Sequence, residues 1–261
     1  MSYSIKVLHF GGQCPWHMWA VKQARKAASR MHGTVETIDV QKHPDLAERF
    51  QMYFPFMTVI NDSVRIPSPV SSNYLINVIR TGAETFPTAP FSPGPPRRAQ
   101  EIKPLTAQNV SLTCPLCIPE SEAKAFRAKH EWASKVLKKT RGKILGFIAF
   151  ENDQPKCTVE FLPAHLVPYP LPEKDNTCAF ITCLYPSDGS SDYRPHLLEH
   201  LTETLPTLGY RKLQVIAGRR TPYPNGPVLF FLMHGFTRCT QVDTITLREG
   251  LEDLILMEKT L

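Results

Sequence analysis

Residues 176–217 read NTCAFITCLYP, SDGSSDYR, PHLLEHLTETLPTLGY and RKLQVIA, four consecutive segments of different character. The first is apolar and rich in Ile, Phe, Cys and Thr, which predicts a buried strand, and the last predicts a second strand. In the third, leucines recur at helical spacing and predict one apolar face: Leu197, Leu198, Leu201, Leu205 and Leu208. A polar loop that opens a helix presents backbone N–H groups to its contents, so the sequence predicts an anion site there.

Five other segments accompany this unit in a fixed order: EIKPLTAQNV (101–110), GKILGFIAFE (142–151), CTVEFLPAH (157–165), FFLMHGFTRC (230–239) and LILMEKTL (254–261). Together with residues 176–217 they resemble the GNAT superfamily of acetyltransferases over most of residues 99–261. The resemblance implies a mixed sheet with flanking helices and an N-acyltransferase activity. It also implies acetyl-CoA or another acyl-CoA as cofactor, with an amine of a small molecule or peptide as acceptor.

The same resemblance implies where the cofactor lies. The backbone of the first strand would bind pantetheine, and the loop would bind the pyrophosphate. The residues concerned are Thr182, Cys183, Leu184, Tyr185, Gly189, Ser190, Ser191, Asp192, Tyr193 and Arg194.

The loop departs from the family pattern of Gln or Arg, two residues, Gly, one residue, and Gly or Ala. Asp192 stands at the central glycine and Arg194 at the last small residue. A carboxylate beside a pyrophosphate is unfavourable, whereas an arginine is a bidentate phosphate ligand. The alternative is a plain helix start, with Asp192 or Ser191 as N-cap and Pro195 in the first turn.

Catalytic groups are harder to assign. The family uses a glutamate near this strand as base and a tyrosine in the late helix as acid, but residues 176–186 hold no carboxylate and Phe231 occupies the tyrosine position. By residue type, Glu160, Tyr185 and His234 are the candidate substitutes. Their alternatives are a solvated strand residue, a capping aromatic and a surface histidine.

The first 82 residues predict the element order β-α-β-α-β-β-α, with Cys14-Pro15-Trp16-His17 after the first strand and Pro55 before the third. This order and motif resemble the thioredoxin fold over residues 3–82. The resemblance implies a reactive Cys14 thiolate at a helix start and a cis Pro55 beside it. Because His17 replaces the second motif cysteine, Cys14 would form mixed disulfides alone, tuned by His17. The alternative is a module without redox chemistry.

Prolines crowd the stretch FPTAPFSPGPPRRAQEIKP, and we expect an extended linker there. The predicted organisation is a thioredoxin-like domain (1–85), a linker (86–104) and a GNAT-like domain (105–261). Cys114-Pro115-Leu116-Cys117 is a CxxC, for which a zinc site, a redox pair and a structural turn are all open. We expect no metal, because no second CxxC follows.

The composition of this 261-residue chain restricts the classes of partner and the compartment that we expect. Its net charge of +6 is spread over scattered Lys and Arg, so we expect no nucleic acid partner, and a polyanionic cofactor equally accounts for the charge. No apolar run is long enough to span a membrane, no signal peptide is visible and the seven cysteines form no dense framework, which favours the cytoplasm.

The sequence therefore predicts an α/β protein: a thioredoxin-like fold followed by a GNAT-like acyltransferase domain. Two alternatives remain open. One is a monothiol oxidoreductase that uses Cys14 on a thiol-containing protein partner. The other is a non-catalytic acyl-CoA-binding or protein-binding protein.

Overall fold

The computed structural model of the chain describes residues 3–82, 93–118, 123–186, 189–221, 224–248 and 250–261, without the side chains of Tyr185 and Pro186. The chain divides into two compact units, each described below by itself. The first comprises residues 1–88 together with 168–170 and 246–251, and the second comprises the remainder. The first part of the proline-rich stretch 86–104, residues 86–92, lies outside the described residues.

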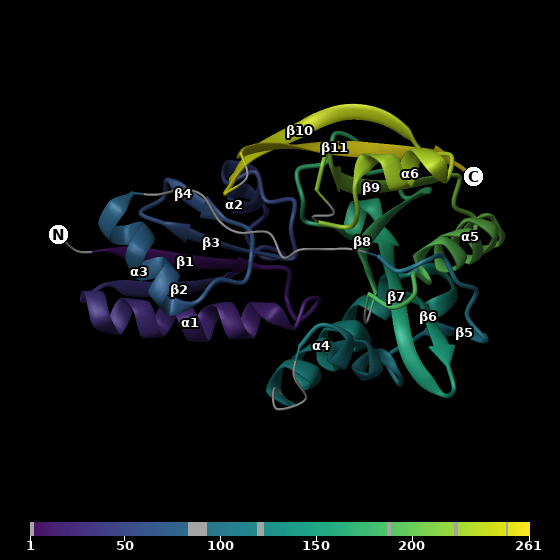
Figure 1. The fold of residues 1–261 in the computed structure, drawn as a ribbon, viewed down its shortest axis with the longest axis horizontal. Helices are drawn as coiled ribbons and strands as arrows, with labels where there is room; N and C mark the ends of the chain where they lie inside the picture. The colour runs from purple at the N-terminus through teal and green to yellow at the C-terminus, as the bar shows by residue number, and fades with distance from the viewer. Residues whose placement is uncertain (1–2, 83–92, 119–122, 187–188, 222–223, 249) are drawn as a thin grey trace. The chain divides into compact units, whose positions relative to one another are not determined.

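The first unit is a four-stranded sheet with helices in the order that the sequence predicts. Its elements are β1 (Ser4–His9), α1 (Trp16–Met31), β2 (Thr34–Asp39), α2 (Pro44–Arg49), β3 (Phe56–Ile60), β4 (Val64–Ile66) and α3 (Ser72–Thr81). The strand order is β2-β1-β3-β4, with β1 and β2 parallel and β3 antiparallel to both β1 and β4. Figure 1 shows α1 running along this sheet. Every residue of β3 is buried, so the core lies at the sheet centre.

The second unit is a seven-stranded sheet of order β10-β11-β9-β8-β7-β6-β5. The strands are β5 (Glu101–Leu105), β6 (Gly146–Glu151), β7 (Gln154–Pro163), β8 (Cys178–Pro186), β9 (Lys212–Gly218), β10 (Thr237–Leu247) and β11 (Gly250–Thr260). Its helices are α4 (Ala123–Val136), α5 (Arg194–Thr204) and α6 (Val228–Met233), with 3-10 segments at Val110–Leu116 and Leu205–Leu208. Strand β5 begins inside the expected linker, and its Pro104 is tolerated because β5 is an edge strand.

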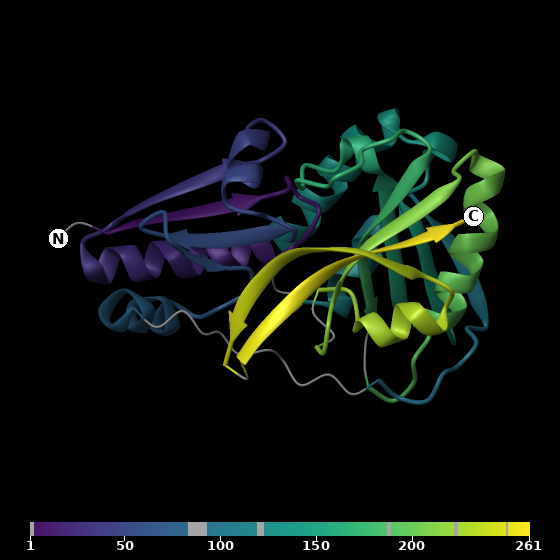
Figure 2. The same ribbon diagram turned by 90° about the horizontal axis from the view of Figure 1, so that it is seen from above.

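The strand, loop, helix and strand predicted for residues 176–217 are confirmed as β8, α5 and β9. Four of the five leucines on the predicted apolar face are buried in one cluster with Val159 and Phe161 of β7. Side chains alternate across a strand, so Glu160 between them points to the opposite face, where it contacts α4. Figures 1 and 2 show α5 and α4 as separate layers beside this sheet. Within the described residues, no helix has the length and apolar character to cross a membrane.

Gly146 provides a test of the sheet register. Its φ is +144°, and a Cβ there would lie 1.8 Å from the carbonyl oxygen of Val159 on the neighbouring strand. We expect Gly146→Ala to lower the free energy of unfolding by about 3 kcal/mol or more, because backbone strain and a backbone clash add. The control is Gly209→Ala, where φ is +80° and the nearest atom belongs to the flexible Arg141 side chain. There we expect about 1–2 kcal/mol. Urea unfolding measures both, and equal losses would contradict the register.

Candidate functional site

The pairing of β8 with β9 ends early, and the stretch beyond it, where the two strands are no longer paired, is called the slot here. Their parallel register covers only three residue pairs, from Cys178 opposite Lys212 to Phe180 opposite Gln214. Strand β8 runs on to Pro186 and β9 to Gly218 without continuing that register, in the part of the chain that the structure describes. Two diverging strands turn backbone N–H and C=O groups toward the space between them. Such a slot suits an extended ligand with amides of its own.

A β-bulge at Thr182 produces the divergence. On the β7 side, Glu160 pairs with Cys183 and Phe161 with Ile181, so Thr182 is the extra residue. A bulge bends its strand and increases the local twist, here just beyond the last β8–β9 pair. The Thr182 side chain is 5% exposed, and its hydroxyl has no hydrogen-bond partner among the described residues. A buried hydroxyl without a partner is costly, so Thr182 is a candidate ligand contact.

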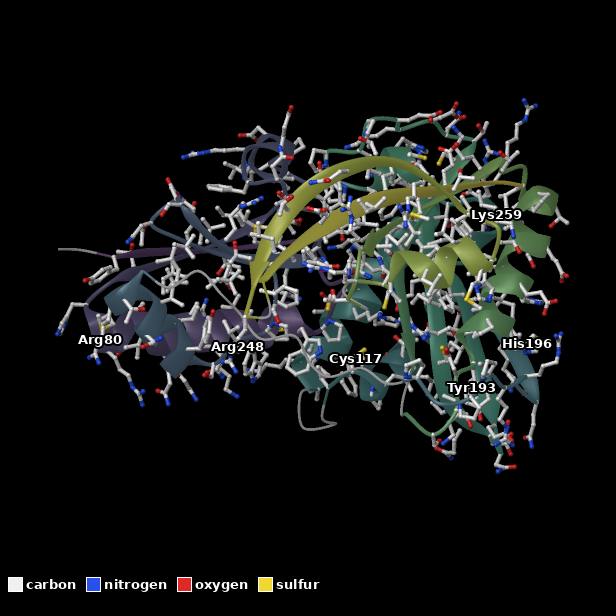
Figure 3. All side chains as sticks on the ribbon, turned by 45° about the horizontal axis from the view of Figure 1, so that its top comes forward. Arg80, Cys117, Tyr193, His196, Arg248 and Lys259 are labelled. Carbon is white, nitrogen blue, oxygen red and sulfur yellow. The ribbon has the colours of Figure 1, made fainter. Side chains whose placement is uncertain are left out.

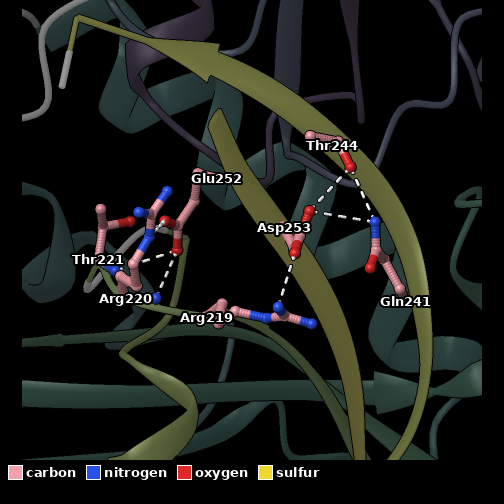
Figure 4. Close-up of polar contacts among 7 residues, drawn as sticks. All are labelled: Arg219, Arg220, Thr221, Gln241, Thr244, Glu252 and Asp253. Atoms are coloured by element: carbon pink, nitrogen blue, oxygen red, sulfur yellow. Dashed lines mark hydrogen bonds and ion pairs between the residues drawn. The ribbon is translucent and has the colours of Figure 1, made fainter. Parts of the chain in front are cut away.

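The far wall of the slot is held by residues that the sequence analysis did not single out. The amide Nδ2 of buried Asn225 donates to the carbonyl of Ile216 on β9 (3.2 Å). At the end of β9, Glu252 accepts the backbone N–H groups of Arg220 (2.7 Å) and Thr221 (3.0 Å) while being 1% exposed (Figure 4). The only sequence signal was an Asn between Pro and Gly after a predicted strand. Tertiary contacts give these residues their role.

An ion pair closes the start of α5. The guanidinium of Arg194 donates to both carboxylate oxygens of Asp192 (2.8 Å each), and the Arg194 N–H donates to one of them (3.1 Å). Both side chains are buried, and Arg194 lies over the ring of Phe230 at 4.7 Å. Asp192 therefore places an anion next to this helix start, but the N-cap residue is Tyr193 and has no side-chain cap, so the expectation of Asp192 or Ser191 as N-cap is wrong. The guanidinium expected to bind phosphate is already engaged.

A strap made of Gly94–Arg97 covers the same loop. The N–H of Asp192 donates to the carbonyl of Pro95 (2.9 Å), and the N–H of Arg97 donates to the carbonyl of Asp192 (2.9 Å). The approach is so close that a Cβ on Gly94 would lie 2.4 Å from the backbone of Ser190. The strap therefore uses the N–H of Asp192, one of the backbone donors in the loop where the sequence predicts an anion site.

The remaining predicted loop residues lie in different surroundings. Gly189 and Ser190 are exposed, Ser191 is half-buried, and Tyr193, labelled in Figure 3, is buried in the apolar cluster that contains the α5 leucines. Tyr185 lies opposite Thr158 in the sheet, but its side chain is outside the described part. Cys183 and Leu184 follow the bulge on β8. The structure therefore brings Thr182–Tyr185 to the slot and turns Tyr193 into the core.

Glu160, expected as a substitute base or a solvated residue, is neither solvated nor alone. It is 1% exposed and forms an ion pair with Lys129 of α4, itself 4% exposed. Burial by itself lowers the pKa of Lys129, but the adjacent Glu160 carboxylate outweighs burial and holds that pKa above its usual value. A carboxylate tied to a buried ammonium is not available as a proton acceptor.

The late helix holds no acid near the slot. Phe231 is fully buried against Phe236, and His234 is half-buried, with its Nδ1 2.7 Å from the carbonyl of Phe230. The expectation of a surface histidine at His234 is therefore only partly met. Phe231 is held against Phe236, and the His234 ring lies against that of Phe230 at 4.5 Å.

In the first unit, Cys14, His17 and Pro55 come to the carboxyl end of β1. Cys14 is half-buried just before α1, and the carbonyl of Pro55 accepts the N–H of Phe10 (2.9 Å). His17 Nδ1 lies 2.7 Å from the carbonyl oxygen of Cys14, and its ring stacks on His9 at 4.9 Å. Burial lowers the pKa of His17 to about 4. The imidazole is therefore neutral at pH 7, and the tuning of Cys14 by His17 stays a prediction.

The CxxC motif lies at the end of the 3-10 segment Val110–Leu116, whose C-cap is Cys117. Cys114 is buried, Cys117 is half-buried, and the N–H of Cys117 donates to the carbonyl of Cys114 in a turn. Burial raises the pKa of the Cys114 thiol to about 11. Across the described ranges, no group of three or more His, Cys, Asp or Glu side chains is placed to hold a metal ion.

Comparison with known proteins gives fold-level likenesses alone. No family model and no curated protein sequence matches the chain. Ribosomal-protein-alanine N-acetyltransferase from Brucella melitensis is 15% identical, with 62% of this chain and 99% of that one covered and a TM-score of 0.46. A GNAT-family acetyltransferase from Streptococcus pneumoniae is 16% identical over 62% and 99%, also at 0.46. Ribosomal-protein-S18-alanine N-acetyltransferase from Escherichia coli is 17% identical over 61% and 92%, at 0.41. At these TM-scores the likenesses support no statement about the site. The description of the site depends on the strand register alone.

The buried pair of Lys129 and Glu160 yields a stability prediction. We expect Lys129→Met to lower the free energy of unfolding by about 3–5 kcal/mol, because it removes the buried cation that neutralises the Glu160 carboxylate. Adding Glu160→Leu removes the stranded charge and should restore most of the loss. Urea unfolding at pH 7 measures all three proteins. A double variant as unstable as the single one would contradict a charge-based cost.

The low pKa of His17 yields a pH prediction for the first unit. The pKa of His17 is about 4 in the folded chain and 6.5 in the unfolded chain, so the unfolded chain binds more protons between these pH values. The contribution of His17 to stability is therefore complete only above pH 6.5. We expect about 3 kcal/mol to be lost as the pH falls from 6.5 through 4. Hydrogen exchange of β1 and β3 amides at pH 7.0 and 4.5 measures it. His17→Gln should flatten the dependence, and an unchanged slope would contradict the assignment.

Proposed function

We propose that the second unit binds an acyl-CoA in the slot between β8 and β9 and transfers its acyl group to an amine. The observation that carries this proposal is the β8–β9 register, which ends after three pairs at the bulge of Thr182. The pantetheine arm of coenzyme A is an extended chain with two amides. It can pair with the diverging strands as a short extra strand pairs with a sheet edge.

In the proposed reaction the amine nitrogen attacks the thioester carbonyl carbon. A C–N bond forms, the C–S bond breaks, and the thiolate leaves while the amine loses a proton. Because Lys129 holds Glu160, we infer that this proton passes to solvent. The rate should then rise with pH up to the pKa of the acceptor amine itself. A small-molecule or peptide amine is the proposed acceptor.

The hydroxyl of Thr182 provides the sharpest test of the slot. We expect Thr182→Val to weaken acetyl-CoA binding about 5- to 20-fold, as loss of one hydrogen bond does, without loss of stability. The matched control is Thr158→Val on β7, whose buried hydroxyl already donates to the carbonyl of Phe147 (3.2 Å). That variant should lose stability and keep its affinity. Calorimetric titration measures the acetyl-CoA affinity of both variants, and urea unfolding measures their stability. Affinity that falls only with Thr158→Val would contradict the slot.

Two further observations favour a protein that binds acyl-CoA without turning it over. Glu160 is engaged by Lys129, and Phe231 is buried where the resemblance places a tyrosine. Mass spectrometry of a panel of amines incubated with acetyl-CoA separates the possibilities. Stoichiometric binding with no acetylated product would favour the binding protein.

We also propose that the first unit is a thioredoxin-like accessory module for a thiol-containing protein partner. Its support is the strand order β2-β1-β3-β4 with Cys14 at the start of α1. A monothiol oxidoreductase remains the second candidate function. Alkylation of Cys14 across pH tests it: a thiol pKa well below the ordinary value favours catalysis, and an ordinary one favours a binding module.

A further inference from the structure

The carboxyl end of β8 precedes the start of α5 in the chain. The slot opens beyond Phe180 and Gln214, toward the carboxyl end of β8, and only seven residues separate Pro186 from Arg194. The N-terminus of a helix is normally where a phosphate at that place would bind. Helix α6 also begins nearby, but it is only six residues long.

Here the start of α5 already holds an anion. The carboxylate of Asp192 accepts hydrogen bonds from the Arg194 backbone N–H and from Nε and Nη2 of its guanidinium, and Pro195 has no N–H to offer. The N–H of Asp192 itself is bonded to Pro95 of the strap. A pyrophosphate placed here would meet a buried carboxylate and two backbone N–H groups, those of Asp192 and Arg194, that are already used.

A second basic region does not replace this site. A cleft of about 540 Å³ lies beside α5, and its lining includes Arg98, His196 and Lys259 (Figure 3). Arg98 pairs with Glu199 (2.9 Å), and Lys259 donates to the carbonyl of His234 (2.9 Å). His196 accepts the N–H of Ala99 through Nδ1 (2.9 Å). These groups are already bonded within the protein.

We propose that this site recognises acyl donors through the pantetheine arm, with no contribution from a pyrophosphate, and that Asp192 is the residue that sets this specificity. The inference rests on the proposed function. The donor class is then any pantetheine thioester, of which an acyl-CoA is one member. The Asp192–Arg194 pair occupies the place of the phosphates.

The test compares two probes on the full-length chain, acetyl-CoA and S-acetylpantetheine, by calorimetric titration. Dissociation constants within threefold of each other, or weaker binding of acetyl-CoA, support the proposal. Binding of acetyl-CoA more than threefold tighter would overturn it and leave the proposed function standing. If neither probe binds, the proposed function fails, and this inference fails with it.

Variants then test the role of Asp192. Asp192→Asn removes the carboxylate and releases the Arg194 guanidinium, so acetyl-CoA should bind at least tenfold tighter while S-acetylpantetheine stays within threefold. Asp192→Asn combined with Arg194→Gln removes both charges and should show no such gain. Thermal unfolding establishes that each variant is folded, and the wild-type comparison stands without them. Equal changes for the two probes in Asp192→Asn would overturn the assignment of Asp192.

Discussion

The parallel pairing of β8 and β9 is the constraint on which the second unit depends. Parallel neighbours cannot be joined by a tight turn, so the chain must cross over one face of the sheet, and α5 is that crossover. Helix α5 buries its leucines on β7 and β8, which anchors both ends of the loop before it. The bulge at Thr182 then bends β8 away from β9. One local irregularity between fixed strands thus produces a space lined by backbone.

Charges in this unit are largely used by the fold itself. Lys129 and Glu160 neutralise each other beneath α4, and Asp192 and Arg194 do so at the start of α5. Each pair is desolvated, so its members are held by strong short-range attraction and are costly to separate. Arrangements of this kind specify structure well and leave little charge for a ligand. This is the physical reason to look to backbone groups and to the hydroxyl of Thr182 for recognition.

Much of the architecture could be predicted from patterns along the chain. The strand-loop-helix-strand at residues 176–217 and the element order of the first 82 residues follow from hydrophobic periodicity and turn residues, which are local properties. The candidate site could be predicted only in part. Asp192 and Arg194 stand where the family pattern has small residues, which indicated that this loop departs from the pattern. Whether Arg194 faces a ligand or its neighbour two residues away depends on the strap from residues 94–97, far away in sequence.

The sequence by itself determined the segments that become strands and helices, the short polar loop before α5 and the cysteine before α1, because these depend on neighbours within one or two turns of chain. Tertiary structure alone decided that Glu160 meets Lys129, that Asn225 bonds to Ile216 of β9 and that the strap of residues 94–97 covers Asp192. Those outcomes depend on contacts across 9 to 97 residues of chain and on the cost of burying an unpaired charge. The spacing of apolar residues along the chain carries no information about such distant contacts or about the cost of burying a charge.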